Sequence, residues 1–232
     1  MKKTTENGSD TKICYLCGKN LATTRDHIFP RSLFPTPRPD DLLTAPACLE
    51  CNNLLPNDEE VFRVLATSGD GLLNPTGRRI WEDRVRPTLV KNRRGFKSLL
   101  QKSLGQLDLY LSDGRYVGSH PGIQFEGPRI ANVINKIAKG LYYVDTQCHL
   151  PINVEIKFDI TQFDPGRYIE GELKEAISGA RRIRIGDGEA VTYWRNCVAD
   201  DPRQSMTWIC FYRSNVLFIL TYTPEYMKQH TG

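Results

Sequence analysis

Two C-x-x-C pairs near the N-terminus constrain the fold of this chain more than any other feature. Cys14 and Cys17 form the first pair, and thirty residues separate it from the second pair, Cys48 and Cys51. Four thiolates at this spacing can close a tetrahedral zinc site, which holds a small fold together without a large core. Because such a site has no open coordination position, we expect a structural zinc ion here and not a catalytic one.

The rest of the composition is that of an ordinary globular protein. The chain has 232 residues, a net charge of +4 and seven cysteines. Residues 1–11 are polar, and we expect a disordered tail with no signal peptide and no membrane segment, hence a cytoplasmic protein. Without a secretion signal, cysteines favour metal binding over disulfides, and the three unpaired ones are expected to be buried free thiols. The three unpaired cysteines are Cys148, Cys197 and Cys210.

Between the two cysteine pairs lies an Asp-His dipeptide, Asp26-His27, and an asparagine, Asn52, directly follows the last cysteine. A neutral imidazole can take a proton from water near pH 7. A carboxylate is a hard oxygen ligand suited to Mg²⁺. Residues 23–29 are strand-like, so the side chains of Asp26 and His27 should point to opposite faces. This stretch therefore carries the residue types needed to hydrolyse a phosphodiester with one divalent ion.

The motif as a whole resembles the HNH nuclease family, whose fold is the ββα-metal fold. The resemblance rests on Asp26-His27, on the run Asp41-Leu42-Leu43-Thr44, and on the run from Cys48 to Asn52. The intervals from His27, fourteen residues to Asp41 and twenty-five to Asn52, fit the family's hairpin plus helix. The sequence of this motif also resembles a group of uncharacterised bacterial and phage HNH proteins. The resemblance covers residues 13–62 and says little about residues 105–232.

The resemblance implies a role for each matching residue. His27 would be the general base that activates water, and Asp26 and Asn52 would hold one Mg²⁺ or other divalent ion. The four cysteines would carry the structural zinc. Asp41 falls where the family has an asparagine that orients the histidine loop, and an ionised aspartate accepts hydrogen bonds but donates none. The implied partner is DNA, with four candidate binding residues: Arg25, Arg31, Arg93 and Arg94.

The hydrophobic patterns predict an α+β protein with three structured parts after the tail. Residues 12–68 form a zinc-stabilised HNH module, in which residues 42–44 are a strand and residues 57–60 a capping box for a helix. Residues 69–104 form a basic helical arm broken at Pro87, with nine Lys or Arg and two acids between Arg78 and Lys102. Residues 105–232 form a mostly antiparallel α+β domain, with a helical stripe over 126–143, a short helix over 171–179 and a hairpin turn at 213–215.

Three functions remain compatible with these patterns. The first is a metal-dependent endonuclease that acts on DNA; if it cuts both strands, one active site per chain suggests a homodimer or two successive nicks. The second is a catalytically inactive, zinc-stabilised module that binds nucleic acid through the basic arm. The third is a redox protein that uses its C-x-x-C pairs. Replacing His27 separates the first two, since a binding module does not need that imidazole.

Overall fold

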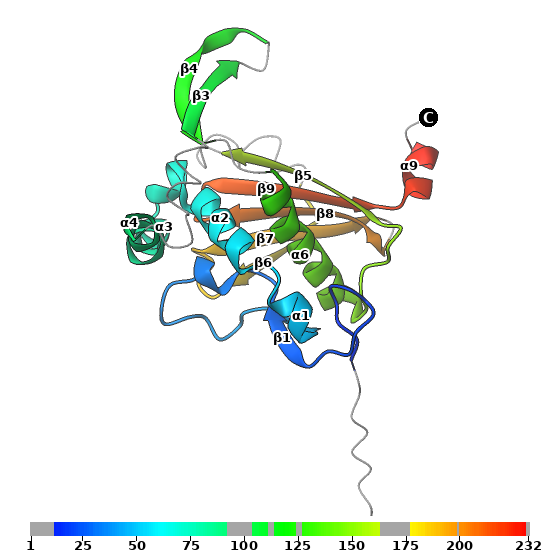
Figure 1. Cartoon of the computed structure of the whole chain (residues 1–232). Coiled ribbons are helices and arrows are strands. Elements are labelled where there is room, and N and C mark those ends of the chain that lie inside the picture. Colours follow the sequence, from blue (N-terminus) through cyan, green and yellow to red (C-terminus); the bar gives the residue numbers. More distant parts are fainter. Residues whose placement is uncertain are drawn as a thin grey trace, which may run out of the picture.

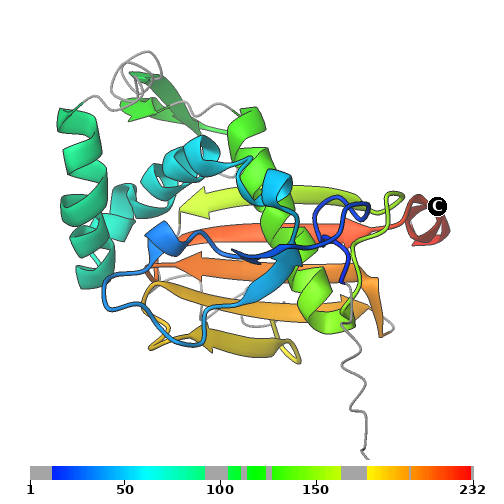
Figure 2. The ribbon, with the colours of Figure 1, turned by 60° about the horizontal axis from the view of Figure 1, so that its bottom comes forward.

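The computed structural model of the protein describes residues 12–91, 104–110, 114–123, 127–162, 177–198 and 200–230. An antiparallel sheet forms one layer, and the long helix α6 (Gly127–Thr146) lies across one face of it. The N-terminal strands and helices lie on that same face, alongside α6 (Figures 1 and 2). The protein is therefore α+β with a mostly antiparallel sheet, as the sequence predicts.

In the described part of the chain, five strands form the main sheet, in the spatial order β5-β9-β8-β7-β6 with antiparallel neighbours. They are β5 (Glu155–Gln162), β6 (Arg181–Ile185), β7 (Val191–Val198), β8 (Asp201–Phe211) and β9 (Asn215–Tyr222). The predicted hairpin joins β8 to β9. Residues 207–211 of β8 are all buried, and Ile209 and Phe211, which share one face of the strand, belong to the core cluster that also includes α6.

Helix α6 carries the predicted apolar stripe, and its most buried apolar side chains are Val133, Ile134, Ile137, Ala138 and Leu141. A Cβ atom at Gly140 would lie only 2.7 Å from the side chain of Ile28. Helix α6 therefore approaches the N-terminal segment as closely as a glycine permits. Lys136 lies one turn before Gly140 on the same side of the helix, so this approach also brings Lys136 against the N-terminal strands.

The strands β1 (Thr24–His27) and β2 (Thr44–Ala47) form an antiparallel pair in which His27 lies opposite Thr44. The prediction placed this second strand at residues 42–44, whereas β2 begins at Thr44 and includes Pro46. A proline is tolerated there because this two-stranded ribbon has open edges. Helix α1 (Leu49–Asn52) begins directly after Cys48, and the 3-10 turn η1 (Arg31–Leu33) lies in the loop between the strands.

Helix α2 (Pro56–Thr67) shows that the capping-box prediction was wrong. Pro56 lies in the first helical turn, and the residue before it makes no side-chain capping bond, because a proline at this position starts the helix without one. Two acids of the supposed box, Asp58 and Glu59, bond side chains of α6 instead, while Glu60 pairs with Arg63 of its own helix. Asn132 donates a 2.8 Å hydrogen bond to Asp58, and Lys136 donates to Glu59.

The basic segment is helical up to Val90, in the elements η2 (Gly69–Leu72), α3 (Pro75–Ile80), η3 (Trp81–Val85) and α4 (Arg86–Val90). Pro87 does not end the helix as predicted. The turn η3 before it is π-helical, and such a turn accommodates the missing N–H and the ring of a proline. Arg79 and Arg86 form exposed ion pairs with acids on the same helix. Arg93 and Arg94 lie outside the described residues.

Two further elements lie away from the candidate site. The hairpin of β3 (Leu104–Tyr110) and β4 (Tyr116–Ile123) extends away from the main sheet, and α9 (Pro224–His230) lies near the C-terminus (Figure 1). Most of the helix predicted over 171–179 falls outside the described residues. Among the helices that the structure describes, none combines the length and apolar character needed to cross a membrane.

Side chains from residues 12–68 and 105–232, predicted as separate domains, enter one buried apolar cluster. The ring of Phe62 in α2 packs edge-on against Phe211 in β8, with centroids 5.5 Å apart. The buried hydroxyl of Tyr212 donates a 2.7 Å hydrogen bond to the carbonyl of Leu33. The N-terminal segment is thus packed onto the sheet and α6, which fixes its position relative to both.

Candidate functional site

The four paired cysteines come together at one point of the N-terminal segment. Every pair of their Sγ atoms lies within 4.8 Å, and Cys14 and Cys48 are buried. The tight turn after Cys14 closes through a hydrogen bond from the Gly18 N–H to the Cys14 carbonyl, with Gly18 at a φ of +63°. Four thiols in this arrangement fit the donor set of a tetrahedral metal ion such as zinc.

The three remaining cysteines are not uniformly buried, contrary to the prediction. Cys210 is buried in β8 and Cys197 is half-buried in β7. Cys148 is exposed, because it follows the end of α6 in a surface turn.

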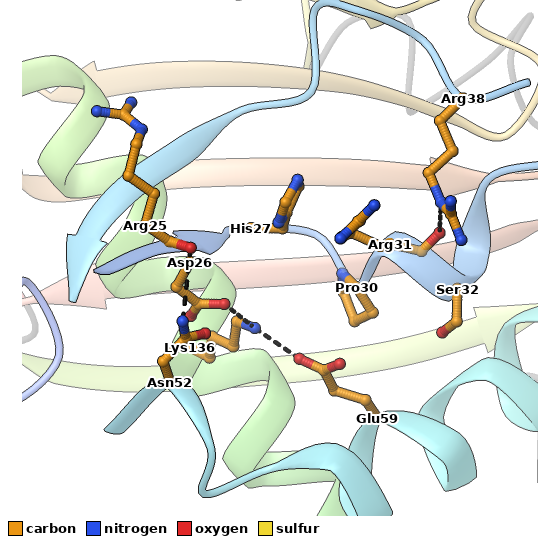
Figure 3. A pocket seen from close by; sticks show the side chains of 10 residues that line it. All are labelled: Arg25, Asp26, His27, Pro30, Arg31, Ser32, Arg38, Asn52, Glu59 and Lys136. Atoms are coloured by element: carbon orange, nitrogen blue, oxygen red, sulfur yellow. Dashed lines mark hydrogen bonds and ion pairs between the residues drawn. The ribbon is translucent and has the colours of Figure 1, made fainter. Parts of the chain in front are cut away.

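Asp26 and His27 point to opposite sides of β1, as expected for neighbouring residues of a strand (Figure 3). Asp26 is 5% exposed and points toward α6. His27 is half-buried and lines a pocket of about 450 Å³. The pocket also includes Asn52, whose Nδ2 donates to the Thr24 hydroxyl at 3.0 Å. The structure therefore brings Asp26, His27 and Asn52 to one pocket.

The surroundings of His27 hold its pKa below the usual value of 6.5. Burial is the largest cause, and the positive charge of Arg31 adds to it. Lys136 and Arg38 act in the same direction, while Asp26 opposes them. The imidazole is therefore neutral at pH 7 and can accept a proton.

Three arginines line the pocket with His27. Arg25 and Arg31 were predicted to bind nucleic acid, and Arg38 was not. Arg25 donates to the Thr44 hydroxyl, and Arg38 donates to the Arg31 carbonyl. Among the described residues, no carboxylate forms an ion pair with any of the three. Burial lowers the pKa of Arg38, and the nearby charges of Arg31 and Arg84 lower it further. This cluster of unneutralised positive charge is suited to bind an anion.

Asp41 does not line this pocket. Both of its carboxylate oxygens lie 2.9 Å from the backbone nitrogen of Gly186, in the turn between β6 and β7. Asp41 thus anchors the proline-rich loop to the sheet, and these contacts do not orient the histidine loop. The residue after His27 is held by a backbone bond instead, from the Ile28 N–H to the Leu43 carbonyl at 3.0 Å.

Sequence reasoning missed Tyr15 and Lys136, the two hydrogen-bond donors to Asp26, of which Lys136 also lines the pocket. The Tyr15 hydroxyl donates to Asp26 Oδ2 at 2.8 Å, and Lys136 Nζ donates to Asp26 Oδ1 at 2.9 Å. Lys136 also bonds Glu59 at 2.5 Å, and both bonds of Lys136 are drawn in Figure 3. A signal was present in the sequence, because Lys136 follows Val133 by three residues and so lies beside the apolar stripe of α6. A lysine at such a position requires a buried acidic partner.

The predicted magnesium site does not fit the side chains around Asp26. Mg²⁺ binds carboxylate oxygens at about 2.1 Å in near-octahedral geometry. Both oxygens of Asp26 already accept hydrogen bonds, and one of the donors is the ammonium group of Lys136. An ion on Asp26 Oδ1 would lie within a few ångströms of this second cation, and a buried setting strengthens the repulsion between them.

Comparison of the chain with protein-family models, with curated proteins and with solved structures finds no match. The fold and site therefore define a class only in general terms. The protein is an α+β protein whose N-terminal four-cysteine cluster is compatible with a metal such as zinc. A pocket rich in arginine, with one neutral histidine, lies on the strand pair next to that cluster.

Proposed function

We propose that this protein is an HNH-type endonuclease that hydrolyses phosphodiester bonds of DNA. One observation carries the proposal: the neutral imidazole of His27 shares a pocket with three arginines that form no ion pair with a described carboxylate. The strand that carries His27 pairs with the strand that leads into Cys48, so the cysteine cluster supports the pocket. This arrangement agrees with the resemblance of residues 13–62 to the HNH family.

The chemistry assigns a task to each of these side chains. The guanidinium groups of Arg31 and Arg38 hold the non-bridging oxygens of the phosphate. His27 accepts a proton from the attacking water, whose oxygen bonds to phosphorus while the bond to the 3′ oxygen breaks. The leaving oxygen takes a proton from solvent. The products then carry a 5′-phosphate and a 3′-hydroxyl.

The test is direct incubation of the purified, zinc-loaded protein with supercoiled plasmid, with and without Mg²⁺. We expect nicked or linear plasmid whose ends a DNA ligase can rejoin, because ligase needs a 5′-phosphate and a 3′-hydroxyl. Single-stranded DNA and RNA serve as competing substrates. Intact plasmid under all of these conditions would refute the proposal.

A zinc-stabilised module that binds nucleic acid without cutting it is the second candidate function. The hydrogen bonds of Asp26 favour it, because Tyr15 and Lys136 occupy the carboxylate that an HNH nuclease uses for its metal ion. The plasmid experiment separates the two candidates. Retarded but uncut plasmid on the gel would support the binding module.

Both candidates predict that the pocket arginines bind phosphate. Replacing Arg31 and Arg38 with glutamine should weaken binding to a short duplex by about tenfold per arginine, since a hydrogen bond to a charged group contributes about 1.5 kcal/mol or more. The slope of log affinity against log salt should fall by about 2, one unit for each lost phosphate contact. Fluorescence anisotropy over a salt series measures both quantities.

A matched control for this experiment is Arg203→Gln. Arg203 also carries a guanidinium group, but it lies in β8 and forms a 2.8 Å ion pair with Asp201. This variant should bind the duplex as the wild type does. The same loss per removed charge in the control and in the double variant would show that net charge, and not the pocket, attracts DNA.

A further inference from the structure

One of the side chains that line the pocket is a buried cation, Lys136. The side chain of Lys136 is 5% exposed, and its Nζ lies between Asp26 and Glu59 (Figure 3). The distances from Nζ are 2.9 Å to Asp26 Oδ1 and 2.5 Å to Glu59 Oε1. A divalent ion held by Asp26 would need much the same position. The ammonium group therefore competes with any such ion for the two carboxylates.

Lys136 has little freedom to leave this position. It lies on a helix of 20 residues whose neighbouring side chains, Val133 and Ile137, are fully buried. One turn later α6 packs so closely against Ile28 at Gly140 that an added Cβ atom would lie 2.7 Å from the Ile28 side chain. Asp26 is fixed on its other side by the Tyr15 hydroxyl. The ion pair is thus set by close packing on both partners and not by flexible surface chains.

The charges in the rest of the pocket supply what a divalent ion would otherwise provide. A catalytic metal ion neutralises the phosphate and stabilises charge that develops on its oxygens. Here Arg25, Arg31 and Arg38 already line the pocket. Preorganised guanidinium groups can perform this electrostatic task.

We propose that Lys136 is the resident cation of this site, standing where an HNH nuclease holds its divalent ion, and that the pocket acts on phosphodiesters without Mg²⁺. The assignment of Lys136 as the resident cation stands on the geometry alone. The statement that the pocket acts on phosphodiesters without Mg²⁺ rests on the proposed function. The proposal assigns Lys136 as a positioning residue that fixes Asp26 and excludes a metal ion. It also predicts that removing the ammonium group opens a metal site made by Asp26 and Glu59.

The test measures binding of Mn²⁺ to zinc-loaded protein by electron paramagnetic resonance, which needs no activity. The wild type should bind Mn²⁺ no more tightly than Asp26→Asn does. Lys136→Met should bind Mn²⁺ about 10- to 100-fold more tightly than the wild type, the range by which residues next to metal ligands alter affinity. The control is Lys139→Met, because Lys139 lies one turn away and, within the described part of the chain, donates to the Leu16 carbonyl and forms no ion pair with a carboxylate. It should bind Mn²⁺ as the wild type does.

The comparison of the wild type with Asp26→Asn can by itself overturn the proposal. If the wild type binds Mn²⁺ and Asp26→Asn abolishes that binding, Lys136 does not exclude the ion. The same proteins are then assayed on plasmid with Mg²⁺ or with a chelator, while their zinc content is checked. Cleavage that needs Mg²⁺ at constant zinc content would also overturn the proposal. If no nucleic acid is cut under any condition, the proposed function fails, and the Mn²⁺ titrations still decide the role of Lys136.

Discussion

Replacing His27 with alanine is expected to slow plasmid cleavage by about 10²- to 10⁴-fold, the usual contribution of a general base. The physical reason is that no other described side chain that lines the pocket carries a nitrogen able to accept a proton near neutral pH, since the arginines and Lys136 are charged and the Asn52 amide is not basic. Affinity for DNA should stay close to that of the wild type, because the arginines remain. Rates come from single-turnover cleavage on gels, and affinities from fluorescence anisotropy.

The control is His149→Ala, which removes an exposed imidazole outside this pocket and should cleave normally. The dependence of rate on pH gives a second measurement. Because burial and Arg31 lower the pKa of His27, the base loses its proton at a lower pH than an unperturbed imidazole does. The rate should therefore rise with pH and level off at a lower pH than a free histidine would give. A His27→Ala variant that cuts at the wild-type rate would show that His27 is not the base.

The N-terminal site could be predicted from sequence as far as its chemistry is local. The C-x-x-C spacing brought the four sulfurs to one cluster, and strand alternation placed Asp26 and His27 on opposite faces. Both are properties of short segments, in which backbone geometry fixes the direction of each side chain. The apolar stripe of α6 and the hairpin of β8 and β9 were predicted for the same reason.

The contacts that decide what the site can bind are not local. Lys136 and Asp26 are 110 residues apart in the chain, and they meet only because Gly140 lets α6 approach the N-terminal segment. Asp41 accepts a hydrogen bond from the turn at Gly186, 145 residues away, where the glycine lets that turn lie close to Pro39. Periodicity shows which face of a helix is buried, but not which element covers it. The sequence could therefore suggest a metal ligand at Asp26 and a lysine beside the buried face of α6, but not that these two side chains meet.

Removing zinc is expected to unfold the N-terminal segment together with the pocket. Structural zinc contributes about 10–16 kcal/mol in zinc-finger peptides, as much as the whole stability of a typical domain. Tyr15 lies between two cysteine ligands in sequence and bonds Asp26, so loss of the cluster also releases the floor of the pocket. Cys48→Ser should lose its zinc, melt at least about 10 °C lower than the wild type and cleave no DNA. Metal analysis, thermal denaturation and the plasmid gel measure the three effects.

Cys148→Ser is the matched control, because this exposed cysteine lies outside the cluster. It should keep one zinc ion per chain and melt with the wild type. Thiol reagents give an independent check, since zinc-bound thiolates should react only after chelation while Cys148 reacts at once. Four cluster thiols that react immediately in freshly purified protein, with no zinc present, would contradict the structural role. The stability of the segment would then have to come from the core that Tyr15 and Phe29 share with α6 and the sheet.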